Sequence, residues 1–163
     1  MKEILVDALK STGYRMEDMT QLQSIFFREK IINSYFEGSK HRYLWEHFKN
    51  IDEIFSVRDS KAWAWLDDFL EGKETIIFFE KSDDPNIYIF PEEQSIVRFL
   101  EESYIDDFYL TNEKLEFLIC FNDHDYLIAT GTAETWLKKK ALELSKTGWR
   151  DMDGKSYLHL ELS

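Results

Sequence analysis

The sequence predicts an α+β fold: a mainly antiparallel sheet of about 5–6 strands with helices packed around it, in one domain over residues 1–163. Apolar residues recur at helical spacing in some segments, and in others they form short runs rich in β-branched and aromatic residues. The short runs follow one another closely and are joined by turn residues, which favours antiparallel pairing over βαβ crossovers. A length of 163 residues also suits one domain.

The N-terminal third predicts two helices. The first covers residues 2–11 and ends near Gly13. The second covers residues 21–36, with Thr20 as its N-cap. Residues 40–56 are ambiguous, because their pattern suits either a helix or a strand. The apolar positions of the second helix predict the face that it buries: Leu22, Ile25, Phe26, Ile32 and Phe36.

The middle of the chain predicts a helix, a hairpin and a second helix. Ser60 is a suitable N-cap for a helix over residues 61–71. Residues 75–79 and 87–90 are short apolar runs with a polar turn between them, so they predict a β-hairpin. Pro91 suits the first position of the next helix. The expected inner face of that helix consists of Ile96, Phe99, Leu100 and Tyr104.

The C-terminal third predicts a three-stranded meander, a helix and a last strand. The meander strands are residues 108–110, 115–121 and 126–129. The helix begins at the N-cap Thr132 and continues through Leu144. Leucines at positions 158, 160 and 162 alternate with more polar residues, which is typical of a half-buried edge strand over residues 157–162.

The acidic charge is concentrated in one part of the chain. The net charge is −12, and residues 51–113 alone carry five basic and seventeen acidic side chains, while the flanking segments are nearly neutral. This distribution argues against nucleic acid as a partner, because phosphate binding requires cationic side chains. It would instead attract a basic protein.

Other observations exclude several classes of protein. The chain has one cysteine and no apolar run long enough to cross a bilayer, so neither a disulfide-stapled secreted domain nor a membrane protein is expected. Acidic residues occupy the positions where a signal peptide would be apolar, and the expected location is the cytoplasm. The sequence has no glycine motif for a nucleotide, and no cofactor or metal is expected.

Catalytic interpretations centre on the hairpin over residues 120–125. Cys120 lies in an apolar strand pattern, and the sequence from Asn122 to Asp125 is typical of a polar turn. An enzyme with a site assembled from Glu80, Cys120, His124 and Asp125 is one alternative to a binding protein. A structural or regulatory interaction domain, marked by a large exposed apolar patch, is another.

Acidic pairs that lie beside aromatic residues are the best candidates for a partner-binding surface. Aromatic side chains and charges together often form the energetic centre of a protein interface. The candidate partner-binding residues are Trp63, Asp67, Asp68, Glu71, Tyr104, Asp106, Asp107 and His124.

One part of the chain resembles a known type of protein. Residues 107–110, residues 118–128 and Gly131 together resemble a signature of small bacterial proteins. These proteins are similar in size, acidity and element order to immunity proteins of polymorphic toxin systems, including the SUKH superfamily. The resemblance implies a non-enzymatic, cytoplasmic antitoxin that neutralises a basic toxin domain by direct binding.

Overall fold

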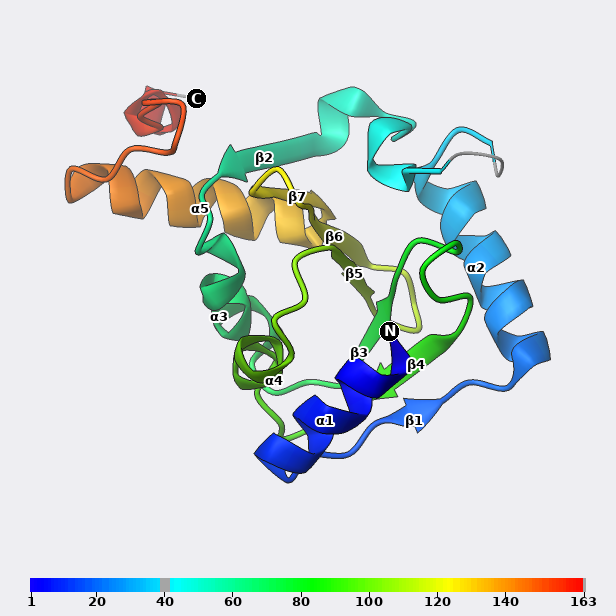
Figure 1. Cartoon of the computed structure of the whole chain (residues 1–163). Coiled ribbons are helices and arrows are strands. Elements are labelled where there is room, and N and C mark those ends of the chain that lie inside the picture. The colour runs from blue at the N-terminus through cyan, green and yellow to red at the C-terminus, as the bar shows by residue number, and fades with distance from the viewer. Residues whose placement is uncertain (39–41, 163) are drawn as a thin grey trace.

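The computed structural model describes residues 1–38 and 42–162 (Figure 1). These residues contain five α-helices and one seven-stranded sheet with the strand order β1-β4-β3-β5-β6-β7-β2. All neighbouring strands are antiparallel. The α+β prediction is therefore confirmed, with more strands than the 5–6 expected.

The predicted hairpin and meander are confirmed, because β3 pairs with β4, β5 with β6, and β6 with β7. Two strands were not predicted outright. The short β1 was missed, and the ambiguous segment before residue 60 ends in β2. The strands are β1 Glu17–Asp18, β2 Ile54–Arg58, β3 Thr75–Phe78, β4 Ile87–Phe90, β5 Phe108–Thr111, β6 Phe117–Phe121 and β7 Tyr126–Gly131.

Both faces of the sheet are covered, so the molecule has two cores (Figure 1). The first core lies between one face and four helices, and the second lies between the other face and α2 with the segment that follows it. Because successive strand residues point to opposite faces, Phe108 belongs to the first core and Tyr109 to the second. The helices are α1 Lys2–Thr12, α2 Gln21–Tyr35, α3 Leu66–Leu70, α4 Ile96–Ser103 and α5 Thr132–Lys146.

The helix α2 forms where the sequence predicts it, and the predicted inner residues Ile32 and Phe36 pack in the second core, but those of its first two turns do not. Thr20 caps it as expected, within a capping box completed by Gln23. Three of the five residues predicted for the inner face are instead exposed: Leu22, Ile25 and Phe26 are 62%, 55% and 56% accessible. The buried side chains are Ser24, Arg28 and Ile31. The prediction was wrong for these three residues because α2 carries apolar residues on both faces, so spacing alone did not select the inner one.

Two helix starts also differ from the prediction. The segment 61–71 divides into a 3₁₀ turn, η3 (Ala62–Trp65), and the short α3. At the start of this segment the Lys61 N–H donates to the Asp59 carboxylate, and not to the side chain of Ser60, the predicted N-cap. The helix expected from Pro91 begins at Ile96, because the Ser95 side chain accepts the Arg98 N–H there.

The C-terminal end of the chain differs most from the predicted secondary structure. Residues 158–162 form a 3₁₀ helix, η4 (Leu158–Leu162), and no edge strand. Tyr157 is buried in the first core, where its hydroxyl donates to Asp151 Oδ2 at 2.6 Å and its N–H donates to Ser145 Oγ at 2.9 Å. These two bonds anchor the segment beside α5, away from a strand position. At the other end of α5, the N-cap is Gly131 and not Thr132.

The ambiguous segment contains both kinds of structure. Its middle forms the 3₁₀ turns η1 (Leu44–Glu46) and η2 (Ile51–Glu53), and its end forms β2. Residues 39–41 lie outside the described residues, so the expected placement of His41 within this segment is not described. The segment closes over the second core, where Phe36 and Leu44 are buried.

Candidate functional site

Four carboxylates gather in one pocket at an end of the sheet. The strand register explains why: Phe78 pairs with Tyr109 and Phe108 pairs with Phe121, so the residues just after β3, just before β5 and just after β6 are neighbours. The pocket has a volume of about 350 Å³. We call it the acidic pocket, and it is lined by Met1, Ile4, Arg42, Tyr43, Ser82, Asp83, Tyr104, Ile105, Asp106, Asp107 and Asp123.

Asp107 is the most perturbed acid of the acidic pocket. Its Oδ1 atom is buried and has no hydrogen-bond partner among the described residues. Burial, and then the negative charges of Glu80 and Asp123, raise the pKa of Asp107 from 3.8 to about 7. This carboxyl therefore gains or loses a proton near neutral pH, and a cation beside it would favour the ionised form.

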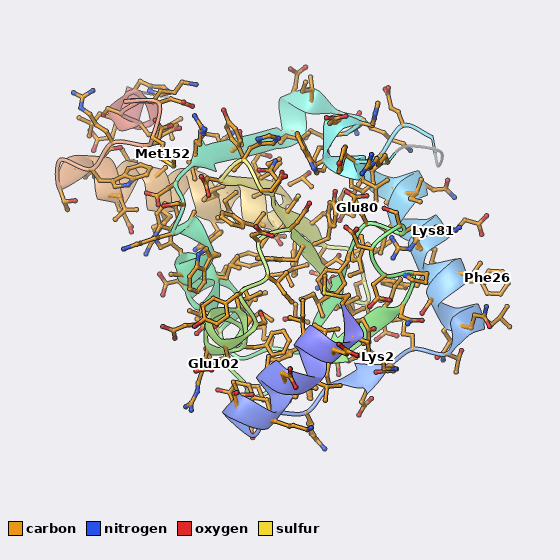
Figure 2. All side chains as sticks on the ribbon, in the orientation of Figure 1. Lys2, Phe26, Glu80, Lys81, Glu102 and Met152 are labelled. Atoms are coloured by element: carbon orange, nitrogen blue, oxygen red, sulfur yellow. The ribbon has the colours of Figure 1, made fainter. Side chains whose placement is uncertain are left out.

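A buried polar network supports one wall of the acidic pocket. Glu80 is 3% accessible, and its carboxylate accepts hydrogen bonds from the Tyr109 hydroxyl and from the Leu44 N–H at 3.0 Å (Figure 2). The backbone N–H of Trp45 donates in turn to the Tyr109 hydroxyl oxygen at 3.1 Å. Burial raises the pKa of Glu80, while its hydrogen bonds act in the opposite direction. These bonds hold η1, which directly follows Arg42 and Tyr43, against the sheet.

Arg28 of α2 supports the same region from the side. Its guanidinium donates to the carbonyl oxygens of Phe79 at 2.9 Å and Asp84 at 3.3 Å, and it lies over the Phe78 ring at 5.5 Å. The Asp84 carboxylate then accepts the Tyr88 hydroxyl at 2.6 Å. The turn that carries Asp83 is thus fixed by a buried cation and a buried acid.

Half of the predicted partner-binding residues lie at the acidic pocket. Tyr104, Asp106 and Asp107 line it directly. Tyr104 was expected to be buried, but it is the C-cap of α4 and is 89% exposed. His124 is exposed on the adjacent turn, where its Nε2 is 3.6 Å from Asp123 Oδ1 and its ring lies 5.7 Å from that of Trp45.

The other half of that set lies elsewhere and has structural partners. Asp67 accepts hydrogen bonds from the Ser95 hydroxyl at 2.5 Å and the Val97 N–H, so it helps to begin α4. Asp68 pairs with Lys140 at 2.6 Å, and Trp63 packs against the first core. Glu71 lies 3.9 Å from Lys73. Asp67 hydrogen-bonds to the first residues of α4 and Tyr104 follows its last residue, about 12 Å along the helix. None of the four residues of this half lines the acidic pocket.

The residues proposed for an enzyme site are also divided. Cys120 is fully buried in the second core, and burial raises the pKa of its thiol well above the usual range. A thiolate is the reactive form of cysteine, so this position disfavours thiol chemistry. His124 and Asp125 lie on the turn, where the Asp125 N–H donates to the Asn122 carbonyl oxygen at 3.0 Å.

Eight lining residues of the acidic pocket were not among the predicted partner-binding residues, and four of these eight have charged or aromatic side chains: Arg42, Tyr43, Asp83 and Asp123. Asp123 and Asp83 could have been found by aligning the predicted strands, since the meander register places residue 122 opposite residue 107 and the hairpin turn follows β3. Arg42 and Tyr43 had no such signal, because they fall in the segment whose structure was ambiguous.

The described part of the chain has neither a cluster that could hold a metal ion nor a helix that could cross a membrane. Within residues 1–38 and 42–162, no three His, Cys, Asp or Glu side chains are placed to hold a metal ion. No helix in the same ranges has the length and apolar composition needed to cross a bilayer.

A protein-family model matches the chain over residues 9–155. The chain belongs to DUF6756, a family of unknown function. No curated protein and no solved structure matches it. The range shared with DUF6756 contains all seven strands and all four carboxylates of the acidic pocket. The family description names no activity, so the likeness to SUKH-type immunity proteins stays a prediction.

Proposed function

We propose that the protein is a non-enzymatic binding protein that captures a basic protein partner at the acidic pocket. Its role would be that of an immunity protein, or antitoxin, neutralising a basic toxin domain in the cytoplasm. The observation that carries the proposal is the convergence of four carboxylates from three separate turns on one pocket of about 350 Å³.

The chemistry of the acidic pocket suits a long cationic side chain. Carboxylates can accept the hydrogen bonds of a guanidinium or ammonium group. Tyr43 and Tyr104 add ring faces on which a cation can lie. The Arg42 guanidinium of the chain itself lies over one face of the Tyr43 ring at 5.2 Å, so the other ring face and Tyr104 are the positions left for a partner's cation.

A toxin domain that cleaves nucleic acid would be a suitable partner. Such a domain must be basic where it holds phosphate, so an acidic surface can occupy that site. The charge that favours this partner also disfavours nucleic acid itself. The cytoplasmic location goes with this role and fits a single, buried, unpaired cysteine.

The proposal is tested by capture and then by neutralisation. The wild-type protein is used to capture partners from a lysate of its source at low and at high salt, beside Asp106→Asn/Asp107→Asn/Asp123→Asn. The control is Asp68→Asn/Glu71→Gln, which removes two acids outside the acidic pocket. We expect a basic protein that is released by salt, lost with the pocket variant and retained with the control.

The captured protein is then expressed in cells with and without this chain. Restored growth with the wild type, but not with the pocket variant, would support the antitoxin role. Failure to recover any basic protein at low salt, or equal capture by all three forms, would contradict the proposal.

An enzyme near the 120–125 hairpin is the second candidate, and Asp107 is the observation that favours it. A carboxyl with a pKa near 7 in a pocket has the properties of a general acid or base. We rank this candidate second because Cys120 is buried in the core whereas His124 is exposed to solvent.

A further inference from the structure

The helix α2 exposes an apolar surface that the acidic pocket does not use. Leu22, Ile25 and Phe26 occupy one side of its first two turns and are each more than half exposed. Figure 2 shows the Phe26 side chain pointing outward, away from the body of the molecule. Exposed apolar side chains that cluster in this way mark interaction surfaces more often than isolated ones do.

The orientation of α2 is held by the other side of the helix. Arg28 is 6% accessible and is fixed by two carbonyl oxygens, and Ser24 accepts the Ile87 N–H at 3.2 Å. Burying a cation requires such partners, because an unpaired buried charge is strongly unfavourable. Rotating α2 to bury Phe26 would break these hydrogen bonds. The bonds of Arg28 and Ser24 therefore keep the apolar side of α2 exposed.

A groove runs beside this surface. It has a volume of about 510 Å³ and lies between α2 and the second face of the sheet. Leu22 and Phe26 form its outer wall, and Ile76 and Ile89 contribute apolar side chains from β3 and β4. The volume lies within the usual range for binding pockets. We call the three exposed α2 residues and this groove the α2 groove.

The rim of the α2 groove is mainly acidic. Glu74 and Glu113 lie on its sheet side, opposite Lys30 on α2. Neither glutamate forms an ion pair among the described residues. An occupant that places a cation beside these two carboxylates and an apolar side chain between them would complement both features.

We infer that the α2 groove binds an apolar segment of a basic protein, with Leu or Phe anchors flanked by Lys or Arg. A second copy of the chain fits less well, since two molecules of charge −12 repel each other. The three exposed side chains also offer only roughly 300 Å² of apolar area, against about 800 Å² per partner in a standard interface. The site is separate from the acidic pocket, and it depends on the proposed function only for the positive charge of the partner.

The test uses a synthetic probe and the whole chain. The probe is a 16-residue helical peptide with Leu and Phe on one face and Lys on the other, labelled for fluorescence anisotropy. Two matched peptides replace Lys by Glu, or Leu and Phe by Ser. We expect saturable binding of the first peptide and at least tenfold weaker binding of the other two.

Variants then locate the binding. Phe26→Ser/Ile25→Ser should weaken binding of the Lys peptide about tenfold while the melting temperature stays within about 2 °C, because both side chains are already exposed. Ile51→Ser is the matched control, since Ile51 is also exposed but lies in η2. The triple Asn variant of the acidic pocket should bind the peptide about as well as the wild type does.

Several outcomes would overturn the inference. Equal binding of the Lys and Glu peptides would refute the charge preference, and undiminished binding by the α2 variant would refute the location. A dimer in sedimentation that Phe26→Ser abolishes would assign the surface to a second copy. Loss of peptide binding only in the acidic-pocket variant would assign the peptide to that pocket, so the two proposals fail independently.

Discussion

At the scale of single residues, Asp107 gives the acidic pocket a dependence on pH. A carboxyl whose pKa is raised by folding stabilises the native state below its ordinary pKa and loses this contribution as pH rises through the raised value. For Asp107 the loss therefore occurs between about pH 4 and pH 7.

We expect Asp107→Asn to be as stable as the wild type near pH 4 and more stable by about 1–2 kcal/mol at pH 8. Urea denaturation across this range measures the difference. Asp106→Asn, at the exposed neighbouring position, is the control and should show no such trend. A constant difference between Asp107→Asn and the wild type from pH 4 to 8 would contradict the assignment.

Gly131 is the residue on which the passage from β7 into α5 depends. Its φ is +66° and its ψ is −140°, a region that only glycine adopts readily. A Cβ built there would lie 2.3 Å from the carbonyl oxygen of Glu116, which belongs to the backbone and cannot move aside easily.

Gly131→Ala should therefore destabilise the protein by about 2–4 kcal/mol through steric overlap and backbone strain. Gly148→Ala is the matched control, because Gly148 also has a positive φ but has no atom within 4 Å of its Cβ position. We expect it to cost about 1 kcal/mol. Similar melting temperatures for the two variants would show that the contact with Glu116 is unimportant.

At the scale of elements, α2 provides a test in which replacing a charged residue should cost more stability than replacing an aromatic one. Arg28→Met should cost about 2–4 kcal/mol, because it leaves two buried carbonyl oxygens without their donor and removes the positive charge that acts on Glu80. Phe26→Ala should change the free energy of unfolding by less than about 0.5 kcal/mol. Urea denaturation of both variants measures this, and the opposite ranking would mean that α2 buries the side that carries Phe26 and not the side that carries Arg28.

The same helix shows how far sequence patterns reach. Thr20 marked the start of α2 correctly, because capping is a local interaction between residues three positions apart. The buried face depended on partners such as Phe79, 51 positions away from Arg28, which local spacing does not contain. The meander was predictable because its interactions are also local: each strand pairs with the next strand along the sequence.

The candidate site was predictable to the extent that it depends on the meander. Asp106 and Asp107 were proposed as partner-binding residues, and the register of β5 with β6 placed Asp123 beside them. Asp67 and Asp68 were proposed on the same grounds but have structural partners, Ser95 and Lys140. The sequence alone does not distinguish an acidic pair that binds a partner from one that pairs with residues of its own chain, because the difference depends on neighbours far away in the sequence.

At the scale of the whole molecule, the charge of −12 acts on stability as well as on partner choice. Repulsion between like charges opposes the compact state, and dissolved salt screens it. We expect the melting temperature to rise by about 2–6 °C between 0.02 M and 0.5 M NaCl. The triple Asn variant of the acidic pocket should show a smaller rise, and a fall with salt would contradict the prediction.

The two edges of the sheet have a consequence for the protein at high concentration. One edge is β1, whose two residues, Glu17 and Asp18, are both acidic and exposed. The other is β2, where the Met152 N–H already occupies the Arg58 carbonyl oxygen at 2.7 Å. Open strand edges are templates on which further chains add, and short, charged or covered edges prevent this. A sheet so rich in apolar strands thus stays finite, and removal of the segment around Met152 would expose a strand edge prone to aggregation.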